Sequence, residues 1–254
     1  MTSIEWGLTS AACITTGAVI GLQIGAMLPK DHIASDSKDT LKITSGMIAT
    51  LVALVLGLLV ASAKNSFDTV NAESVNAGSK LIYLDHLLAR YGPETKPARQ
   101  VLRNSIIESI TRMWPEENNG MSGTQALEKG GRGVEGVLDT LDGLTPTTDS
   151  QRQLIAQARQ ICGELHQSRW LAIEQEQNTL PTTFLIVLLC WLTMLFISIG
   201  LFAPRNITVF MSLLFCAISF STAIFLIVEL SRPLDGIMKI SSAPMRKVLE
   251  HLGE

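Results

Sequence analysis

An uncharged and proline-free run opens the second apolar segment of the chain and reads Ile43-Thr44-Ser45-Gly46-Met47-Ile48-Ala49-Thr50-Leu51-Val52-Ala53-Leu54-Val55-Leu56-Gly57-Leu58-Leu59-Val60-Ala61-Ser62-Ala63. This run is long enough to cross the hydrocarbon core of a bilayer as a helix. The chain continues through Lys64 and Asp68 and meets no strong helix breaker before Gly92-Pro93. The sequence therefore predicts one helix from Ile43 to Tyr91, with its first half in lipid and its second half in water.

Three further apolar runs extend this interpretation to four membrane spans. They cover Gly7–Leu28, which Pro29 ends, then Pro181–Ala203 and Ile207–Leu230. The first of them is rich in glycine and alanine, which allows helices to approach closely in lipid. The composition agrees, because 47% of the 254 residues are apolar and only 17% are charged. A polar connection is expected between the first two spans, from Lys30 to Lys42.

The segment between the second and third spans is expected to be helical and aqueous. Its part in the long helix carries an apolar seam at heptad-like spacing: Phe67, Val70, Ser74, Ala77, Leu81, Leu84 and Leu88. Amphipathic helices follow over residues 98–113 and 149–178, with a weaker one around Val134–Leu141 between them. These helices, or a neighbouring subunit, would cover the seam. The prediction is an all-α chain divided as 1–63 (spans one and two), 64–180 (cytoplasmic helical domain), 181–231 (spans three and four) and 232–254 (amphipathic tail).

Charge decides orientation and excludes one class of partner. Basic residues near the spans are slightly more numerous on the side that holds both termini and the long middle segment, so that side is predicted to be cytoplasmic. The net charge of −3 argues against binding to nucleic acid, which needs a basic surface. The lipid bilayer is the first partner that the sequence implies.

The sequence offers no arrangement of residues typical of an enzyme or a metal site. The four histidines are scattered, and no serine or cysteine has a recognisable base nearby in the sequence. No catalytic, metal-binding or cofactor-binding residue is therefore assigned. No ionisable residue lies centrally in a span, where it would mark an ion or proton relay. Glu229, at the end of the fourth span, and Arg232, three residues later, are predicted to form an ion pair at the membrane interface.

The second span has two distinguishable faces. One is a stripe of small residues at Gly46, Thr50, Ala53, Gly57 and Ala61, which is suited to helix packing. The other is an aliphatic face with a polar extension. Its candidate gate residues are Thr44, Ile48, Leu51, Val55 and Leu58, and its candidate vestibule residues are Ser62, Lys64, Asn65, Thr69, Asn76 and Lys80. An aliphatic belt above a polar vestibule fits a pore that gates by dewetting, but the same face would also suit contact with lipid.

The sequence resembles a family of bacterial membrane proteins described as having a bestrophin-like domain. The resemblance is carried by segments spread over nearly the whole chain: Asp36-Ser37-Lys38-Asp39, Ala49–Asp68, Leu84-Asp85, Tyr91-Gly92-Pro93-Glu94, Trp114-Pro115, Gly200-Leu201-Phe202-Ala203-Pro204, Glu229-Leu230-Ser231-Arg232-Pro233 and Ser242-Ala243-Pro244. The resemblance implies the layout of bestrophins, which are pentameric anion channels with a hydrophobic neck on the second span. The aromatic neck residues and the acidic calcium clasp of animal bestrophins are absent, so calcium gating is not implied.

The function predicted from residues and resemblance together is a homo-oligomeric ion channel of the bacterial inner membrane. Its pore would be lined by the second span, it would conduct inorganic ions, with anions favoured, and the resemblance favours a pentamer. Lys64 and Lys80 would attract anions at the cytoplasmic mouth. The alternative is a non-conducting membrane scaffold or sensor whose cytoplasmic helical bundle binds a protein partner.

Overall fold

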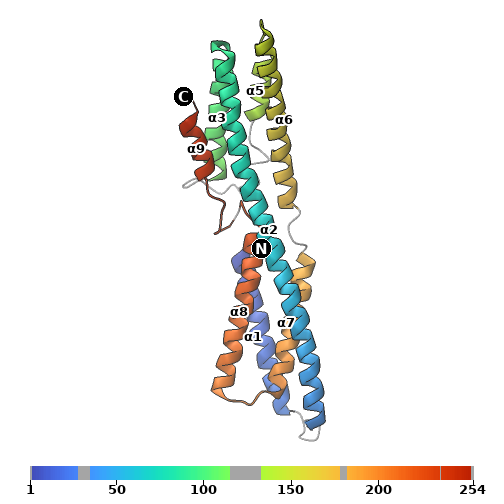
Figure 1. The fold of residues 1–254 in the computed structure, drawn as a ribbon. Helices are drawn as coiled ribbons and strands as arrows, with labels where there is room; N and C mark the ends of the chain where they lie inside the picture. Colours follow the sequence, from blue (N-terminus) through green and yellow to red (C-terminus); the bar gives the residue numbers. More distant parts are fainter. Residues whose placement is uncertain (1, 28–34, 115–132, 178–181, 235, 253–254) are drawn as a thin grey trace. The chain divides into compact units, whose positions relative to one another are not determined.

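A computed structural model describes residues 2–27, 35–114, 133–177, 182–234 and 236–252, and most of these residues are helical. The elements are α1 (Ser3–Met27), α2 (Ser35–Tyr91), the 3-10 turn η2 (Pro93–Thr95), α3 (Lys96–Met113), α5 (Gly133–Asp142), α6 (Asp149–Gln177), α7 (Thr182–Phe202), α8 (Ile207–Leu230) and α9 (Ala243–His251) (Figure 1). No strand occurs among these residues. The prediction of an all-α protein is confirmed. The sequence also predicts a polar loop at residues 116–123 and a helix N-cap at residues 179–181, and both segments lie outside the described residues.

Four helices are long and apolar enough to cross a membrane: Ser3–Met27, Asp39–Tyr91, Thr182–Phe202 and Ile207–Leu230. This confirms the four expected spans, and the fourth has the bounds that the sequence predicts. The expected connection from Lys30 to Lys42 was wrong in its second part, because α2 already begins at Ser35. Residues 35–42 contain neither proline nor glycine, so nothing in this segment stops the helix from extending toward its N-terminus.

The chain divides into two compact units. The membrane unit comprises Met1–Ser66 and Leu180–Ser231, and the helical unit comprises Phe67–Thr179 and Arg232–Glu254. The boundary inside α2 follows a change in composition, from the uncharged run before Lys64 to the mixed polar sequence after it. Each unit has its own packing, and each is described separately.

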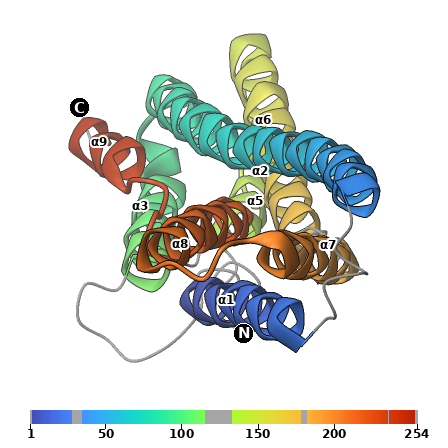
Figure 2. The ribbon, with the colours of Figure 1, turned by 90° about the horizontal axis from the view of Figure 1, so that it is seen from below.

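Glycines bring α1 into close contact with α7 in the membrane unit, where α1 also lies along α8 (Figure 2). A Cβ atom at Gly21 or Gly25 would overlap the backbone carbonyl oxygen of Ile197 or Leu201, respectively. From the opposite side, a Cβ atom at Gly200 would lie 2.5 Å from the carbonyl oxygen of Ala18. Lipid does not drive apolar helices together as water does, so such backbone-to-backbone contact is a main source of packing energy.

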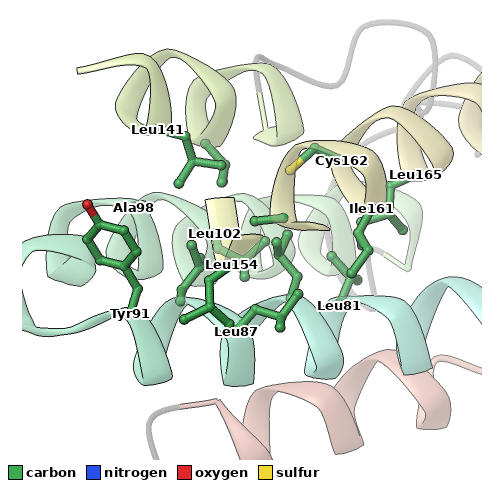
Figure 3. Packing of buried hydrophobic residues seen from close by; sticks show 14 of the residues in the cluster. Leu81, Leu87, Tyr91, Ala98, Leu102, Leu141, Leu154, Ile161, Cys162 and Leu165 are labelled. Atoms are coloured by element: carbon green, nitrogen blue, oxygen red, sulfur yellow. The ribbon is translucent and has the colours of Figure 1, made fainter. Parts of the chain in front are cut away.

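The helical unit is built on one apolar cluster that joins α2, α3, α5, α6 and α9 (Figure 3). Leu84 and Leu88 of the seam are buried, as are Leu102 of α3 and Cys162 of α6. The same chain therefore covers this part of the seam, through the helices that the sequence placed at 98–113 and 149–178. Of the two possibilities left open for Leu81–Leu88, cover within the subunit is the correct one.

A tight turn and an ion pair fix α3 against the end of α2. Gly92 has a φ of 140°, a backbone conformation that favours glycine, and it precedes Pro93 at the start of η2. Thr95 Oγ1 then donates a hydrogen bond to the carbonyl oxygen of Gly92 at 2.8 Å. Just beyond the turn, Arg99 Nε donates to Asp85 Oδ1 at 2.7 Å. The turn and the ion pair together hold α2 and α3 side by side.

Candidate functional site: the exposed face of α2

Only a narrow face of α2 is buried within the membrane unit. Val52 is 1% exposed, Leu59 is 7% exposed and Ala63 is 2% exposed. Their spacings of seven and four residues place them on one side of the helix. On the same side, Ser45 Oγ lies 2.7 Å from Ser198 Oγ of α7, which ties α2 to its own subunit. The rest of the circumference of this apolar helix segment is left for lipid, water or another molecule.

The five predicted gate residues fall into two groups. Thr44, Leu51 and Leu58 are exposed, with 54% of Leu51 and 66% of Leu58 accessible. Ile48 and Val55 are half-buried, at the edge of the face that packs within the subunit. An α-helix turns about 100° per residue, so residues seven apart form a row along one side. Ile48 and Val55 form a second row beside the first. The structure brings Thr44, Leu51 and Leu58 into one exposed row.

The stripe of small residues lies on another exposed side of α2. Gly46, Thr50, Ala53, Gly57 and Ala61 are all exposed. A Cβ atom added at Gly46 or Gly57 would meet nothing within 4 Å. This contrasts with Gly21 and Gly25 of α1, where the backbone of α7 occupies the space that a Cβ atom would need. Among the described parts of the subunit, α2 therefore presents a smooth surface on which no other helix is packed at these two glycines.

Most of the predicted vestibule residues continue the exposed row beyond the apolar run. Ser62, Asn65, Thr69 and Asn76 are exposed, and the helical periodicity places them below Leu51 and Leu58. Lys64 is also exposed, and its spacing of seven residues from Gly57 places it on the side of the small-residue stripe rather than in this row. The row therefore changes along its length from aliphatic side chains to hydroxyl and amide side chains.

Lys80 has a partner that the sequence does not reveal. Lys80 Nζ lies 2.9 Å from Glu164 Oε2 of α6, and Gln160 Nε2 donates to the other carboxylate oxygen at 3.1 Å. The hydrogen bond from Lys80 lowers the pKa of Glu164 below its usual value, and the hydrogen bond from Gln160 adds a smaller effect in the same direction. Periodicity shows which face of a helix is buried but not which residue of a distant helix lies opposite. The carboxylate offsets the charge that Lys80 was predicted to contribute.

Glu229 is held by the start of the first span. The residue is 1% exposed, and Ser3 Oγ donates a hydrogen bond to its Oε2 atom. Ser3 is also the first residue of α1, where unpaired backbone N–H groups favour a nearby carboxylate. Arg232 is half-buried, and its ion pair with Glu229 stays a prediction. The contact to Ser3 was not foreseen, because 226 residues separate the two positions.

The described residues contain no group of three or more histidine, cysteine, aspartate or glutamate side chains that could hold a metal ion. One helix exposes an aliphatic row, a polar continuation and a small-residue stripe, and none of these needs a bound cofactor to form.

Comparison with protein families gives a match. A family model described as the Bestrophin-like domain matches residues 12–245. Neither the curated proteins nor the solved structures include a match. The family match covers nearly the whole chain, from within α1 to within α9, and includes all of α2. With four helices able to span a bilayer, this chain is a membrane protein that belongs to the bestrophin-like family.

Proposed function

We propose that the protein is an oligomeric ion channel whose pore is lined by α2. Membership of the bestrophin-like family supports a channel rather than an enzyme. The observation that carries the proposal is the exposed row on α2, which passes from Thr44, Leu51 and Leu58 to Ser62 and Asn65.

The three sides of α2 suit three neighbours in a ring of subunits. Val52 and Leu59 pack within the subunit. The stripe that contains Gly46 and Gly57 is smooth enough for a helix of the next subunit to approach closely. The row that contains Leu51 and Leu58 then faces the axis of the ring. The family resemblance favours five subunits.

The gate of this channel is a hydrophobic constriction. Leu51 and Leu58 lie seven residues apart, or about 10 Å along the helix, so a ring would place two aliphatic collars in series. Narrow apolar collars close a pore by excluding water. Ile48 and Val55 lie beside the collars, at the edge of the face of α2 that packs within the subunit. Thr44 is the first residue of the row.

Anions are the preferred ions, on the strength of the family resemblance and of Lys64. This residue is exposed close to where the apolar run of α2 ends. Lys80 contributes less than its formal charge, because Glu164 lies 2.9 Å from its Nζ atom. The distribution of basic residues favours the cytoplasm for the helical unit and both termini. The family resemblance favours the inner membrane of a bacterium for the spans.

Ion flux through the purified protein in liposomes tests the proposal. We expect wild-type protein to conduct chloride and the Leu51→Ala variant to conduct more, because a smaller collar retains water. Ile186→Ala is the matched control, since Ile186 of α7 is 50% exposed and Leu51 is 54% exposed. This control should leave the flux unchanged.

The oligomeric state, measured by native mass spectrometry, provides an independent readout. A ring of subunits without flux in either wild type or Leu51→Ala would contradict the channel and favour the scaffold whose helical bundle binds a partner. A monomer in lipid nanodiscs would contradict the pore itself, because one α2 helix cannot enclose a lumen.

A further inference from the structure

One side of α2 is exposed within the helical unit. It carries residues at alternating steps of four and three, and all of them are exposed: Ala72, Asn76, Ser79, Tyr83 and His86. Leu81 belongs to the buried cluster (Figure 3), and Tyr83 follows it by two residues, or about 200° of helical rotation. These five residues therefore lie opposite the buried seam. We call them the outer row of α2.

The side of α2 that carries the outer row lacks charge. The structure describes every residue from Asn71 to Ala89, and none of the exposed ones carries a formal charge when histidine is counted as neutral. The three charged residues of this stretch lie elsewhere on the helix. Glu73 and Lys80 are half-buried, and Asp85 is buried.

The outer row differs from an ordinary solvated helix surface. In the same unit, α6 exposes Asp149, Arg152 and Arg159. The cores of protein–protein interfaces, in contrast, are depleted of charged residues and enriched in aromatic ones. Tyr83 of the outer row is 52% exposed, and Val75 beside the row is 48% exposed. The absence of charge and the exposed aromatic side chain together indicate a surface that contacts another protein chain.

The chemistry of the outer row suits a second copy of this chain. The amide of Asn76, the hydroxyls of Ser79 and Tyr83 and the neutral imidazole of His86 each contain both a donor and an acceptor. Rotational symmetry brings the same residue of every copy to one level, where such a group is able to bond to its own counterpart. A charged side chain would instead repel its counterpart. A different protein is more readily selected by charge complementarity, which this row does not offer.

We propose that the outer rows of neighbouring copies meet around the axis of the oligomer. Alternating steps of four and three are the spacing at which parallel helices pack into a bundle, with each position of the row forming one layer. The layers from Ala72 to His86 span about 21 Å of helix. Asn76 sets the register between copies, as a polar seam residue does in coiled coils. The row ends before Arg90, in the last turn of α2, because its charge would not suit a further layer.

The proposal rests on the oligomer of the proposed function but not on ion conduction. Cross-linking at Ser79 tests it. The full-length Ser79→Cys variant keeps the buried Cys162, and its other three cysteines are replaced by serine. It is reconstituted in vesicles with a large excess of lipid and treated with a short bismaleimide. Gln157→Cys in the same background is the control, because Gln157 is exposed on α6, outside the row.

We expect covalent dimers and larger products at position 79 and only monomer at position 157, measured on denaturing gels. Equal cross-linking at the two positions would overturn the proposal, because contact would then not be specific to the outer row.

A charge placed in the row gives a second readout. Tyr83→Glu should raise the protein concentration at which half of the chains are assembled in detergent by about tenfold or more, because like charges then meet at one level. Gln157→Glu adds the same charge outside the row and should leave that concentration unchanged. Native mass spectrometry measures both variants. Assembly of Tyr83→Glu at the wild-type concentration would contradict the contact.

The outcomes distinguish this contact from the proposed channel. An oligomer that does not cross-link at position 79 would overturn the contact and leave the channel standing. Cross-linking at position 79 without ion flux would support the contact and contradict the channel. A monomer in vesicles would overturn both.

Discussion

Arg99 forms a two-pronged ion pair with Asp85, through Nε to Oδ1 at 2.7 Å and through a terminal guanidinium nitrogen to Oδ2 at 2.7 Å. Asp85 is 4% exposed, and the guanidinium of Arg99 compensates its charge beside the apolar cluster of the helical unit. The hydrogen bond that Arg99 donates to Asp85, opposed in part by desolvation, raises the pKa of Arg99 above its usual range. The pair connects the end of α2 to the start of α3.

Removing the guanidinium should destabilise the helical unit strongly. We expect Arg99→Gln to lower the free energy of unfolding by about 3 kcal/mol, because it leaves a buried carboxylate without its counter-charge. Asp85→Asn combined with Arg99→Gln should recover part of this loss, and thermal unfolding in detergent measures both. The exposed pair of Arg152 and Asp149, with side chains 64% and 90% exposed, is the control. Arg152→Gln should change stability by less than about 0.5 kcal/mol, and a loss as large as that of Arg99→Gln would contradict the argument.

Burial of Cys162 should make stability depend on alkaline pH. Desolvation raises the pKa of this thiol to about 11, from 9.0. A group whose pKa is raised by folding stabilises the fold below its unfolded pKa, and that contribution is lost as pH rises through the folded pKa. Stability should therefore fall between pH 9 and 11. By the size of the shift, the loss is at most about 3 kcal/mol. Cys162→Ala should show a shallower fall over that window in chemical unfolding, whereas an identical slope in the two proteins would contradict the prediction.

Substitution by alanine should have opposite effects on stability at a tightly packed glycine and at an open one. Gly21→Ala places a methyl group against the backbone of α7 at Ile197. We expect it to destabilise the membrane unit by about 1–3 kcal/mol, despite the better helix propensity of alanine. Gly57→Ala meets nothing within 4 Å and should leave the melting temperature of the subunit unchanged or slightly higher.

A larger side chain at position 57 separates folding from assembly. Gly57→Leu should keep the fold of the subunit and weaken the oligomer, if the small-residue stripe packs against the next subunit as proposed. Circular dichroism and native mass spectrometry report on fold and assembly, respectively. Wild-type assembly in Gly57→Leu would place the subunit interface elsewhere.

Removing Glu164 should strengthen the preference for anions in the proposed channel. Glu164→Gln frees the charge of Lys80, so the permeability ratio of chloride to sodium should rise, whereas Lys64→Gln should lower it. The lowered pKa of Glu164 keeps its carboxylate charged as pH falls through the usual range for glutamate. Acid should therefore raise the permeability ratio of chloride to sodium, as Glu164→Gln does, only at a pH below that range, where Glu164 becomes protonated. Reversal potentials in planar bilayers measure the ratio, and a fall on Glu164→Gln would contradict the assignment of Lys80 to the vestibule.

The sequence predicts helices and faces better than it predicts partners. The bounds of α8 follow from the sequence because Pro204-Arg205-Asn206 and Arg232-Pro233 flank an unbroken apolar run. The seam through Leu84 and Leu88 is likewise visible as a repeat. By contrast, the predicted gate residues follow one another at steps of three and four, and such a set occupies two neighbouring rows of a helix. Which row is exposed depends on the packing of Val52 and Leu59.

Pairings between distant segments could not be predicted from one sequence. Nothing near Lys80 points to Glu164, and nothing near Glu229 points to Ser3. The close approach of the α1 and α7 backbones at these glycines could not be predicted either. Glycine content shows that helices are able to approach closely, but not which backbone fills the space or which glycines stay open, as Gly46 and Gly57 do.

The close packing of α1 on α7 and α8 also constrains the order of events during synthesis. The first span leaves the ribosome long before its partners, since 183 residues separate Leu22 from Arg205, which donates to its carbonyl oxygen. The glycine face of α1 therefore has neither α7 nor α8 to pack against while α2 and the whole sequence from Phe67 to Thr179 are synthesised. Within that waiting time, the turn at Gly92–Thr95 needs only neighbouring residues and is able to form early. Assembly of the membrane unit is thus a late step, which completes only when the final span has been inserted.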